Sequence, residues 1–329
     1  MTMRAAYYEK VGPARDVLHV GEVPTPEPAA GEVRVRVRWS GVNPSDVKSR
    51  SGLRHRTLAF PRVIPHSDGS GVIDRVGAGI DRSRIGERVW LWNAAWGRAF
   101  GTAAEYVCLP SRMAVKLPEG VDEVVGACLG IPALTAMHAV LMDGGVAGKT
   151  VLVSGGAGAV GHYAIQLAGR LGAARVISTV SGPVKAALAA AAGADDVINY
   201  KTEDVVQRVR DITSGAGVDR AIEMDVAVNG AQDLELLRIG GDCVAYGSSP
   251  APLNLAFPTL LAKNIQLRFF MVYHLADADR ERAIATLHRM LKLGALTHNI
   301  GERMPLADIV EAHEKVEQGK VAGNLVLAV

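Results

Sequence analysis

The first third of the chain shows the short alternation of polar and apolar positions that is typical of β-strands. In residues 32–40 the valines and the tryptophan occupy every second position, and Arg34, Arg36 and Arg38 lie between them. This is the period of a half-buried strand, so we expect the three arginines on a solvated sheet face. Further short strands, separated by glycine and proline, continue to about residue 122. The pattern predicts a β-rich, barrel-like domain.

After residue 150 the pattern changes, and apolar strands alternate with stretches of helical period. The chain offers six such strands up to about residue 273. The alternation predicts an α/β fold with a doubly wound, six-stranded parallel sheet of the Rossmann type. Two more helices and a closing strand over residues 324–329 are expected to return to the first domain. The predicted domains are therefore residues 1–122 with 274–329, and residues 123–273.

A glycine-rich turn joins the first of these strands to a helix. The segment reads Thr-Val-Leu-Val-Ser-Gly-Gly-Ala-Gly-Ala-Val-Gly over residues 150–161. Gly155 and Gly156 permit the turn, Gly158 lets backbone amides approach a pyrophosphate, and Gly161 lets the helix pack closely on its strand. A phosphate would lie at the positive end of the helix. The strand–turn–helix context predicts dinucleotide binding, with contacts from Ala157, Gly158, Ala159 and Val160.

The end of the second strand bears on which nicotinamide cofactor binds. An NAD site usually offers Asp or Glu about twenty residues beyond the glycine turn, to bond the ribose 2'-hydroxyl. Here Ser181 and Gly182 occupy that position, and no acidic residue follows until Asp195. A 2'-phosphate would meet no repulsion, so the sequence favours NADPH.

Composition narrows the function classes. With 36 basic and 34 acidic residues the chain is close to neutral, which argues against a dedicated nucleic-acid or membrane-surface protein. No apolar run reaches membrane-spanning length. Residues 1–10 contain Arg4, Glu9 and Lys10 and no apolar core of signal length, so we expect no secretory signal there. Cys108, Cys128 and Cys243 are far apart in apolar runs, as expected of buried thiols in a reducing compartment. We expect a cytoplasmic protein.

Several motifs are spread along nearly the whole chain. They are Gly-Val-Asn-Pro at 41–44, Arg-Ser-Gly at 50–52, Gly-Ile-Pro-x-x-Thr-Ala at 130–136, the glycine turn, Ile-Glu-Met at 222–224 with Val228-Asn229, Asp-Leu-x-Leu-Leu at 233–237, and Glu-Ala-His at 311–313. Together they resemble the medium-chain dehydrogenase/reductase superfamily, and within it the zinc-independent quinone oxidoreductases of the zeta-crystallin type. The resemblance implies a GroES-like first domain and a homodimer or homotetramer. An exposed sixth strand over residues 265–272 would suit pairing across a two-fold axis.

The resemblance also implies a set of cofactor contacts. Lys185 and Tyr200 fall where relatives hold the 2'-phosphate, although Lys185 also fits a plain helix surface. Thr135 would bond the nicotinamide ribose or, equally well, its own helix backbone. The remaining expected contacts are Ser181, Asn229, Tyr246, Gly247, Ser248, Ser249, Met271, Val272 and Tyr273.

The same resemblance argues against a metal. Zinc-dependent relatives have Cys where this chain has Asn43, and a His-Glu pair where it has Ser67 and Asp68. A catalytic zinc needs about three Cys, His or carboxylate ligands, which these positions do not supply well. We expect no metal. His66 lies one position from the family's histidine, so a shifted zinc site stays open beside a histidine that simply forms hydrogen bonds.

For catalysis the sequence offers Asn43 as a hydrogen-bond donor to the acceptor carbonyl, or alternatively as a turn-stabilising residue. Lys48 replaces a tyrosine that close relatives carry, and could attract an anionic product. Trp96 could stack on a flat quinone ring or pack structurally. Asp46 fits a helix start better than an acid catalyst.

Three functions follow from the sequence. The first is a zinc-independent NADPH:quinone reductase that acts on a planar quinone. The second is an NADPH-dependent reductase of enones or enoyl compounds, which the same scaffold supports. The third is an NADPH-binding protein with a non-enzymatic role, in RNA binding or structure. The near-neutral charge weighs against RNA.

Overall fold

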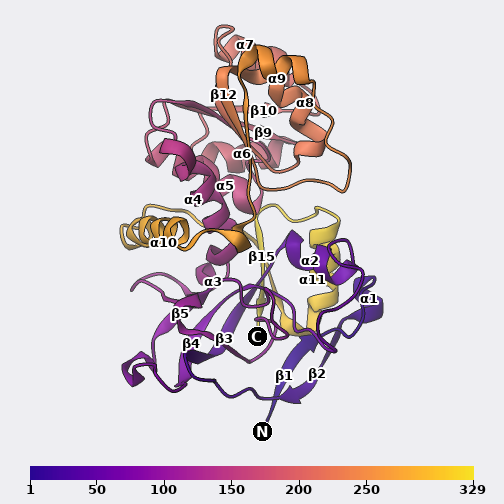
Figure 1. The fold of residues 1–329 in the computed structure, drawn as a ribbon, viewed down its shortest axis with the longest axis vertical. Helices are drawn as coiled ribbons and strands as arrows, with labels where there is room; N and C mark the ends of the chain where they lie inside the picture. Colours follow the sequence, from indigo (N-terminus) through magenta and orange to yellow (C-terminus); the bar gives the residue numbers. More distant parts are fainter. The chain divides into compact units, whose positions relative to one another are not determined.

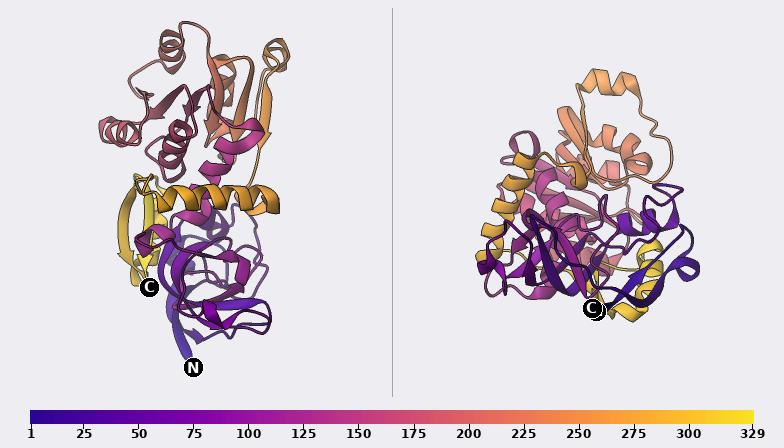
Figure 2. Two further views of the ribbon diagram at one scale, coloured as in Figure 1. Left: turned by 90° about the vertical axis from the view of Figure 1, so that its left-hand side faces the viewer. Right: turned by 60° about the horizontal axis from the view of Figure 1, so that its bottom comes forward.

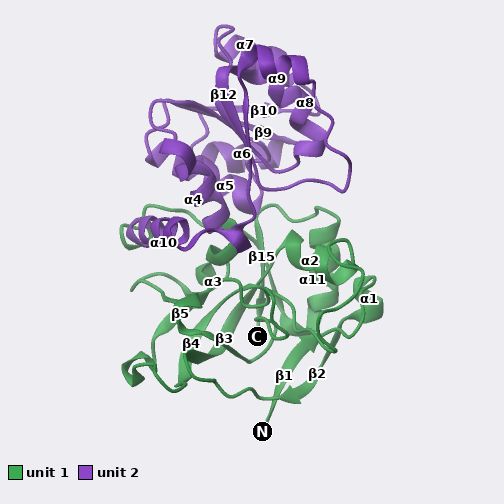
Figure 3. Cartoon of the chain, viewed as in Figure 1, with its two compact units in different colours: residues 1–132, 291–329 green, residues 133–290 purple.

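The computed structural model describes residues 1–329, which form two compact units (Figures 1 and 3). Unit 1 comprises residues 1–132 and 291–329, and unit 2 comprises residues 133–290. Unit 1 is β-rich and unit 2 carries a six-stranded parallel sheet, so the predicted fold class is confirmed. No helix has the length and apolar character that a membrane span requires.

Unit 2 alternates strands and helices as the apolar pattern predicts. Its strands are β8 (Thr150–Val153), β9 (Arg175–Val180), β10 (Asp196–Asn199), β11 (Val218–Glu223), β12 (Leu237–Ala245) and β13 (Gln266–Phe269). Its helices are α4 (Leu134–Leu141), α5 (Ala159–Arg170), α6 (Pro183–Ala191), α7 (Val205–Ile212), α8 (Val226–Leu236), α9 (Phe257–Lys263) and most of α10 (Asp277–Lys292).

The parallel sheet has the strand order β10-β9-β8-β11-β12-β13, with helices on both of its faces (Figure 2). Because both faces are covered, its central strands carry many apolar side chains, and Leu152, Ile177 and Ala221 are completely or almost completely buried. The strand order reverses between β8 and β11. Ligands of doubly wound sheets bind at the carboxyl ends of the strands beside such a reversal.

One buried ion pair ties the sheet of unit 2 to α4. The Arg220 guanidinium on β11 binds both carboxylate oxygens of Asp242 on β12, at 2.7 Å each. Its third nitrogen donates to the carbonyl oxygens of Ala139 and Met142 at the end of α4. Arg220 has no exposed surface, so these hydrogen bonds take the place of all the water that would otherwise hydrate its guanidinium group.

Unit 1 is built around a seven-stranded sheet. Its strands and those of a separate hairpin are β1 (Thr2–Tyr7), β2 (His19–Pro24), β3 (Glu32–Val42), β4 (Asp68–Val76), β5 (Arg88–Leu91), β6 (Tyr106–Pro110), β7 (Ala114–Lys116), β14 (Ile300–Pro305) and β15 (Asn324–Ala328). The sheet order is β14-β15-β3-β4-β5-β7, with β6 also paired to β3, while β1 and β2 form the hairpin. The helices are α1 (Ala14–Val17), α2 (Pro44–Ser51), α3 (Glu123–Gly126) and α11 (Ile309–Glu317).

The C-terminal strand returns to the first domain as predicted. β15 lies between β14 and β3, and its residues Leu325 and Leu327 pack in the unit 1 core. The unit bounds differ from the predicted domain bounds at both crossings. Residues 123–132 belong to unit 1, because α3 packs on its strands. Residues 274–290 belong to unit 2, where Arg280 of α10 donates to the carbonyl oxygen of Val272.

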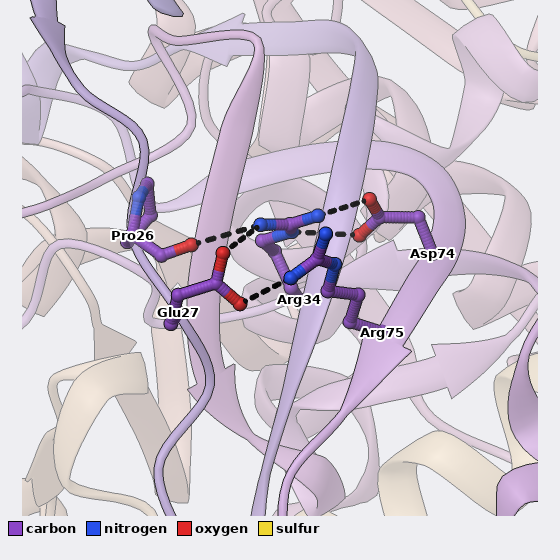
Figure 4. Close-up of polar contacts among 5 residues, drawn as sticks. All are labelled: Pro26, Glu27, Arg34, Asp74 and Arg75. Carbon is purple, nitrogen blue, oxygen red and sulfur yellow. Dashed lines mark hydrogen bonds and ion pairs between the residues drawn. The ribbon is translucent and has the colours of Figure 1, made fainter. Parts of the chain in front are cut away.

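The prediction of a solvated arginine face on β3 is wrong for Arg34, although Arg36 and Arg38 are exposed. Arg34 is only 4% exposed and binds both carboxylate oxygens of Asp74 on β4 (Figure 4). It also donates to Glu27 and to the carbonyl oxygen of Pro26. The β3–β4 pairing supplies the partner that makes burial of this charge tolerable.

We predict that Arg220→Met lowers the free energy of unfolding by about 3 kcal/mol or more, because it leaves Asp242 buried without its counter-charge. Urea denaturation followed by circular dichroism measures the loss. The control is Arg238→Met, which removes a half-exposed pair with Asp219 and should cost less than about 1 kcal/mol. Equal losses of unfolding free energy in the two variants would show that the Arg220–Asp242 pair stabilises the fold no more than the Arg238–Asp219 pair does.

Candidate active site

The glycine turn of unit 2 brings strand, turn and helix into close backbone contact. α5 begins at Ala159 immediately after Gly158, so its free amides lie at the carboxyl end of β8. A Cβ atom at Gly161 would lie 2.3 Å from the carbonyl oxygen of Gly155. Only glycine allows this approach of helix to turn. Nothing comparable crowds Gly158, which leaves its backbone accessible to a phosphate.

A buried carboxylate at the end of β11 organises the neighbouring loops. Glu223 has no exposed surface, and its Oε1 accepts hydrogen bonds from the Asp225 backbone amide (2.5 Å) and from Asn229 Nδ2 (2.9 Å). Its Oε2 accepts one from the Ser154 hydroxyl at the start of the glycine turn. Asp225 in turn accepts from the Ser249 backbone amide at 2.7 Å. Three segments of the nucleotide edge are thus joined through one side chain.

Glu223 has a second carboxyl group beside it. Asp233 on α8 is 2% exposed and forms a side-chain hydrogen bond with Glu223. Burial, and then the neighbouring Glu223 carboxylate, raise the pKa of Asp233 to about 8. At neutral pH Asp233 therefore holds a proton, which it shares with Glu223. A single negative charge, rather than two, remains at this position.

A cavity of about 860 Å³ opens at this edge of the sheet. Ser154, Thr179 and Met224 contribute to its wall, at or near the ends of β8, β9 and β11. Two of the predicted cofactor contacts, Tyr200 and Asn229, also line it. The cavity has the position that a doubly wound sheet gives to its nucleotide.

The predicted 2'-phosphate residues come from adjacent segments. The Tyr200 backbone amide donates to the carbonyl oxygen of Val180, which places Tyr200 beside the end of β9 that leads to Ser181. Lys185 is a half-buried residue of the first turn of α6. The Lys201 ammonium lies 5.3 Å from the centre of the Tyr200 ring. Lys201 is therefore a second cation, besides Lys185, in the segments predicted to bind the 2'-phosphate.

The other predicted cofactor residues lie at the same edge of the sheet or in α4. Tyr246, Gly247, Ser248 and Ser249 follow β12, and Met271, Val272 and Tyr273 follow β13. Thr135 is buried in the first turn of α4. Their contacts with a cofactor stay predictions.

In unit 1, Asn43 connects two buried carboxyl groups. Its Nδ2 donates to Asp68 Oδ2 at 2.9 Å, and its backbone amide donates to Asp46 Oδ2 at 2.9 Å. Asp46 also accepts hydrogen bonds from the Asn43 side chain and the Ser67 backbone. Burial raises the pKa of Asp46 to about 7 and the pKa of Asp68 well above its usual range. Asn43 is 4% exposed and its amide is engaged by these carboxyl groups.

Helix α2 and the loop after it bring further polar groups to this cluster. Lys48 is a half-buried residue of α2. The Arg54 guanidinium lies over the Trp96 ring, with its Cζ atom 5.2 Å from the ring centre. Arg54 also acts electrostatically on Asp46. Asn43 and Lys48 thus lie at the start of α2 and within it, and Arg54 of the following loop contacts Trp96.

The residues present do not fit a zinc ion. The Asn43 amide nitrogen is a hydrogen-bond donor to Asp68, and no group of three or more His, Cys, Asp or Glu side chains is placed to hold a metal. Both ring nitrogens of His66 are engaged, by Ser40 at 2.8 Å and by His313 at 2.9 Å. These bonds favour a structural His66 over a shifted zinc site. Zinc independence stays a prediction.

Comparison with known proteins places both units in one superfamily. Residues 29–119 match the alcohol dehydrogenase GroES-like domain, and residues 159–289 match the family described as zinc-binding dehydrogenase. The human protein named quinone oxidoreductase is 31% identical over 93% of this chain and 92% of its own length. A Burkholderia protein named 2-haloacrylate reductase is 29% identical over 99% of both chains.

Solved structures agree with these matches. A mycobacterial protein in complex with NADPH superposes with a TM-score of 0.87 and 32% identity, over 99% of this chain and all of the other. The two domains together define an alcohol-dehydrogenase-type oxidoreductase. The chain belongs to the quinone oxidoreductase-like members of the medium-chain dehydrogenase/reductase superfamily. It binds NADPH, as that family and the edge of unit 2 indicate.

The sequence analysis did not identify three residues that the structure makes candidates for a functional role. Glu223 and Asp233 fall in motifs that the family resemblance uses, but nothing in the sequence shows that they meet. The available signal was the Glu223 carboxylate directly after the apolar pair Ala221 and Ile222 at the end of a strand. Arg54 lies in a polar loop, and only its contact with Trp96 draws attention to it.

We predict that Asp233→Asn flattens the dependence of stability on pH. In the folded wild type the pKa of Asp233 is raised from 3.8 to about 8, so folding binds a proton between these values. The stability due to Asp233 is therefore complete below about pH 4 and is lost as pH rises through about 8. Urea denaturation across this range should show a falling wild-type stability, and a smaller fall in the variant, whose amide still donates to Glu223. Parallel curves would contradict the shared proton.

Proposed function

We propose that this protein is a zinc-independent NADPH:quinone reductase that acts on a planar quinone. The observation that carries the proposal is the similarity to quinone oxidoreductases over nearly the whole chain, at 31% identity for the human protein. The geometry is consistent with it. Unit 2 offers a nucleotide edge that Glu223 organises, and unit 1 offers an aromatic ring, Trp96, among polar groups of α2.

Bound NADPH supplies a hydride, and the protein has to orient the acceptor and stabilise the negative charge that develops on its oxygen. In unit 1 the cations of Lys48 and Arg54 suit that second task. The Asn43 amide is engaged by Asp46 and Asp68, and it keeps these two carboxyl groups in a fixed relation. A direct bond from Asn43 to the acceptor stays a prediction, since one of these bonds would have to be exchanged for it.

The second candidate is an NADPH-dependent reductase of activated alkenes. The Burkholderia relative named 2-haloacrylate reductase supports it, because that name describes reduction of a carbon–carbon double bond next to a carboxyl group. The two reactions share the hydride donor and differ in the atom that accepts the hydride.

We also propose a homodimer or homotetramer in the cytoplasm. β13 lies at an edge of the parallel sheet, and Phe269 on it is 57% exposed. Pairing two copies through this edge would cover it. All three cysteines are buried free thiols, which suits a reducing compartment.

Turnover tests the proposal directly. Chelator-treated protein is mixed with NADPH or NADH, and cofactor oxidation is followed by absorbance with 9,10-phenanthrenequinone or 2-cyclohexenone as acceptor. We expect fast oxidation of NADPH by the quinone and slower oxidation of NADH. Turnover of the enone alone would favour the alkene reductase. Activity that is lost with the chelator and restored by zinc would overturn the metal-free assignment.

We predict that Lys185→Ala lowers kcat/KM for NADPH by about tenfold, because a charge-assisted contact with the 2'-phosphate is lost. The value for NADH should change by less than about threefold, since NADH lacks that phosphate. Lys149→Ala is the matched control, because Lys149 precedes β8 at the opposite edge of the sheet. Equal losses with the two cofactors would remove Lys185 from the phosphate site.

A further inference from the structure

Asp233 is a buried carboxyl group in the wall of the cavity of about 860 Å³ at the nucleotide edge of unit 2. It lies on α8 and is only 2% exposed. Its side chain forms a hydrogen bond with Glu223 and accepts a weak one from the Cys243 thiol, with 4.0 Å between sulfur and Oδ2. Neither of these partners is a cation, so Asp233 is best accommodated without a charge.

Glu223 has three neutral donors of its own. They are the Ser154 hydroxyl, the Asp225 backbone amide and the Asn229 side-chain amide. These donors accommodate one carboxylate, and the proton on Asp233 supplies a further hydrogen bond to it. When Asp233 loses this proton, two buried carboxylates face each other and repel. The repulsion acts directly on the carboxylate that joins the glycine turn to α8.

NADPH brings negative charge to the same edge of the sheet. Its pyrophosphate and 2'-phosphate are anionic, and the glycine turn suited to the pyrophosphate is bonded to Glu223 through Ser154. A second charge on the carboxyl pair would oppose these phosphates and disturb the turn. Binding of the cofactor and binding of the proton by Asp233 therefore favour each other, because linkage between two ligands is reciprocal.

We propose that Asp233 is a proton-dependent positioning residue of the NADPH site. While it is protonated it donates to Glu223, which keeps the glycine turn and α8 in the arrangement that binds the cofactor. Loss of the proton weakens NADPH binding. The inference concerns cofactor binding alone, so it does not rest on the proposed reduction of a quinone or an alkene.

Other ionisable groups surround the pair. On β12, burial and then Asp233 raise the pKa of the Cys243 thiol far above neutral pH, and burial and then Glu223 do the same to the pKa of Tyr246. The remaining charged groups around the cavity and α8 are Glu203, Asp204 and Arg210 from α7 and the loop before it, Asp225 after β11, Glu235 on α8, and Lys263 on α9. Asp233→Asn leaves all of these groups in place, so its difference from the wild type isolates Asp233.

The test measures the dissociation constant of NADPH by fluorescence between pH 7 and pH 9.5 at constant ionic strength, where the cofactor's phosphates are already ionised. Burial, and then the Glu223 carboxylate, raise the pKa of Asp233 to about 8. Wild-type Kd should therefore rise by about fivefold from pH 7 to pH 9, since one proton is linked to binding. Asp233→Asn keeps an amide donor to Glu223 and has no proton to lose. Its Kd should stay within about twofold of the wild-type value at pH 7 over the whole range.

Asp211→Asn is the matched control, since Asp211 is an exposed carboxyl group of α7 that accepts from Gln207 at 2.8 Å. It should reproduce the wild-type rise of Kd with pH, and circular dichroism at each pH checks that the proteins stay folded. The same rise in wild type and Asp233→Asn would overturn the inference. Weak binding by Asp233→Asn at every pH would also overturn it, by showing that the shape of Asp233 matters and its proton does not.

A second measurement needs no variant. Calorimetric titrations of the wild type with NADPH at pH 8.5, in two buffers of different ionisation enthalpy, should show uptake of a fraction of a proton per cofactor bound. Binding without proton uptake, or a wild-type Kd that does not change with pH, would overturn the inference while NADPH binding itself stands.

Discussion

The buried Glu223 carboxylate is the contact on which the nucleotide edge of unit 2 depends. It joins Ser154 of the glycine turn, Asn229 of α8 and, through Asp225, the segment after β12. A fully buried charge is costly unless each of its oxygens is satisfied, and here hydrogen bonds reach both oxygens. The shared proton with Asp233 keeps the local charge at one. The same hydrogen bonds that let the charge be buried also fix the relative positions of three segments at this edge of the sheet.

Unit 1 uses buried carboxyl groups in a related way. The Asn43 backbone amide donates to Asp46 and its side-chain amide donates to Asp68. Both carboxyl groups are buried, and their hydrogen bonds to Asn43 make this burial tolerable. Arg54 of the loop after α2 acts electrostatically on Asp46 and lies over the Trp96 ring.

Much of the fold could be predicted from the sequence, because the signals were local. The strand period around β3 and the apolar strands separated by helices both follow from residues near each other in the chain. The glycine turn was clear for the same reason. What the sequence could not show were contacts between distant residues. Arg34 is buried because β4 brings Asp74 to it, and Arg54 gains a role because Trp96 comes from another loop. The pairing of Glu223 with Asp233 likewise exists only once α8 packs beside β11.

The measurement that tests the account most directly is a calorimetric titration of the chelator-treated protein with NADPH and with NADH. The account predicts one site per chain, and binding of NADPH that is tighter than that of NADH by about tenfold or more, because the contact with the 2'-phosphate is charge-assisted. Equal affinities for the two cofactors, or binding that appears only after zinc is added, would contradict it.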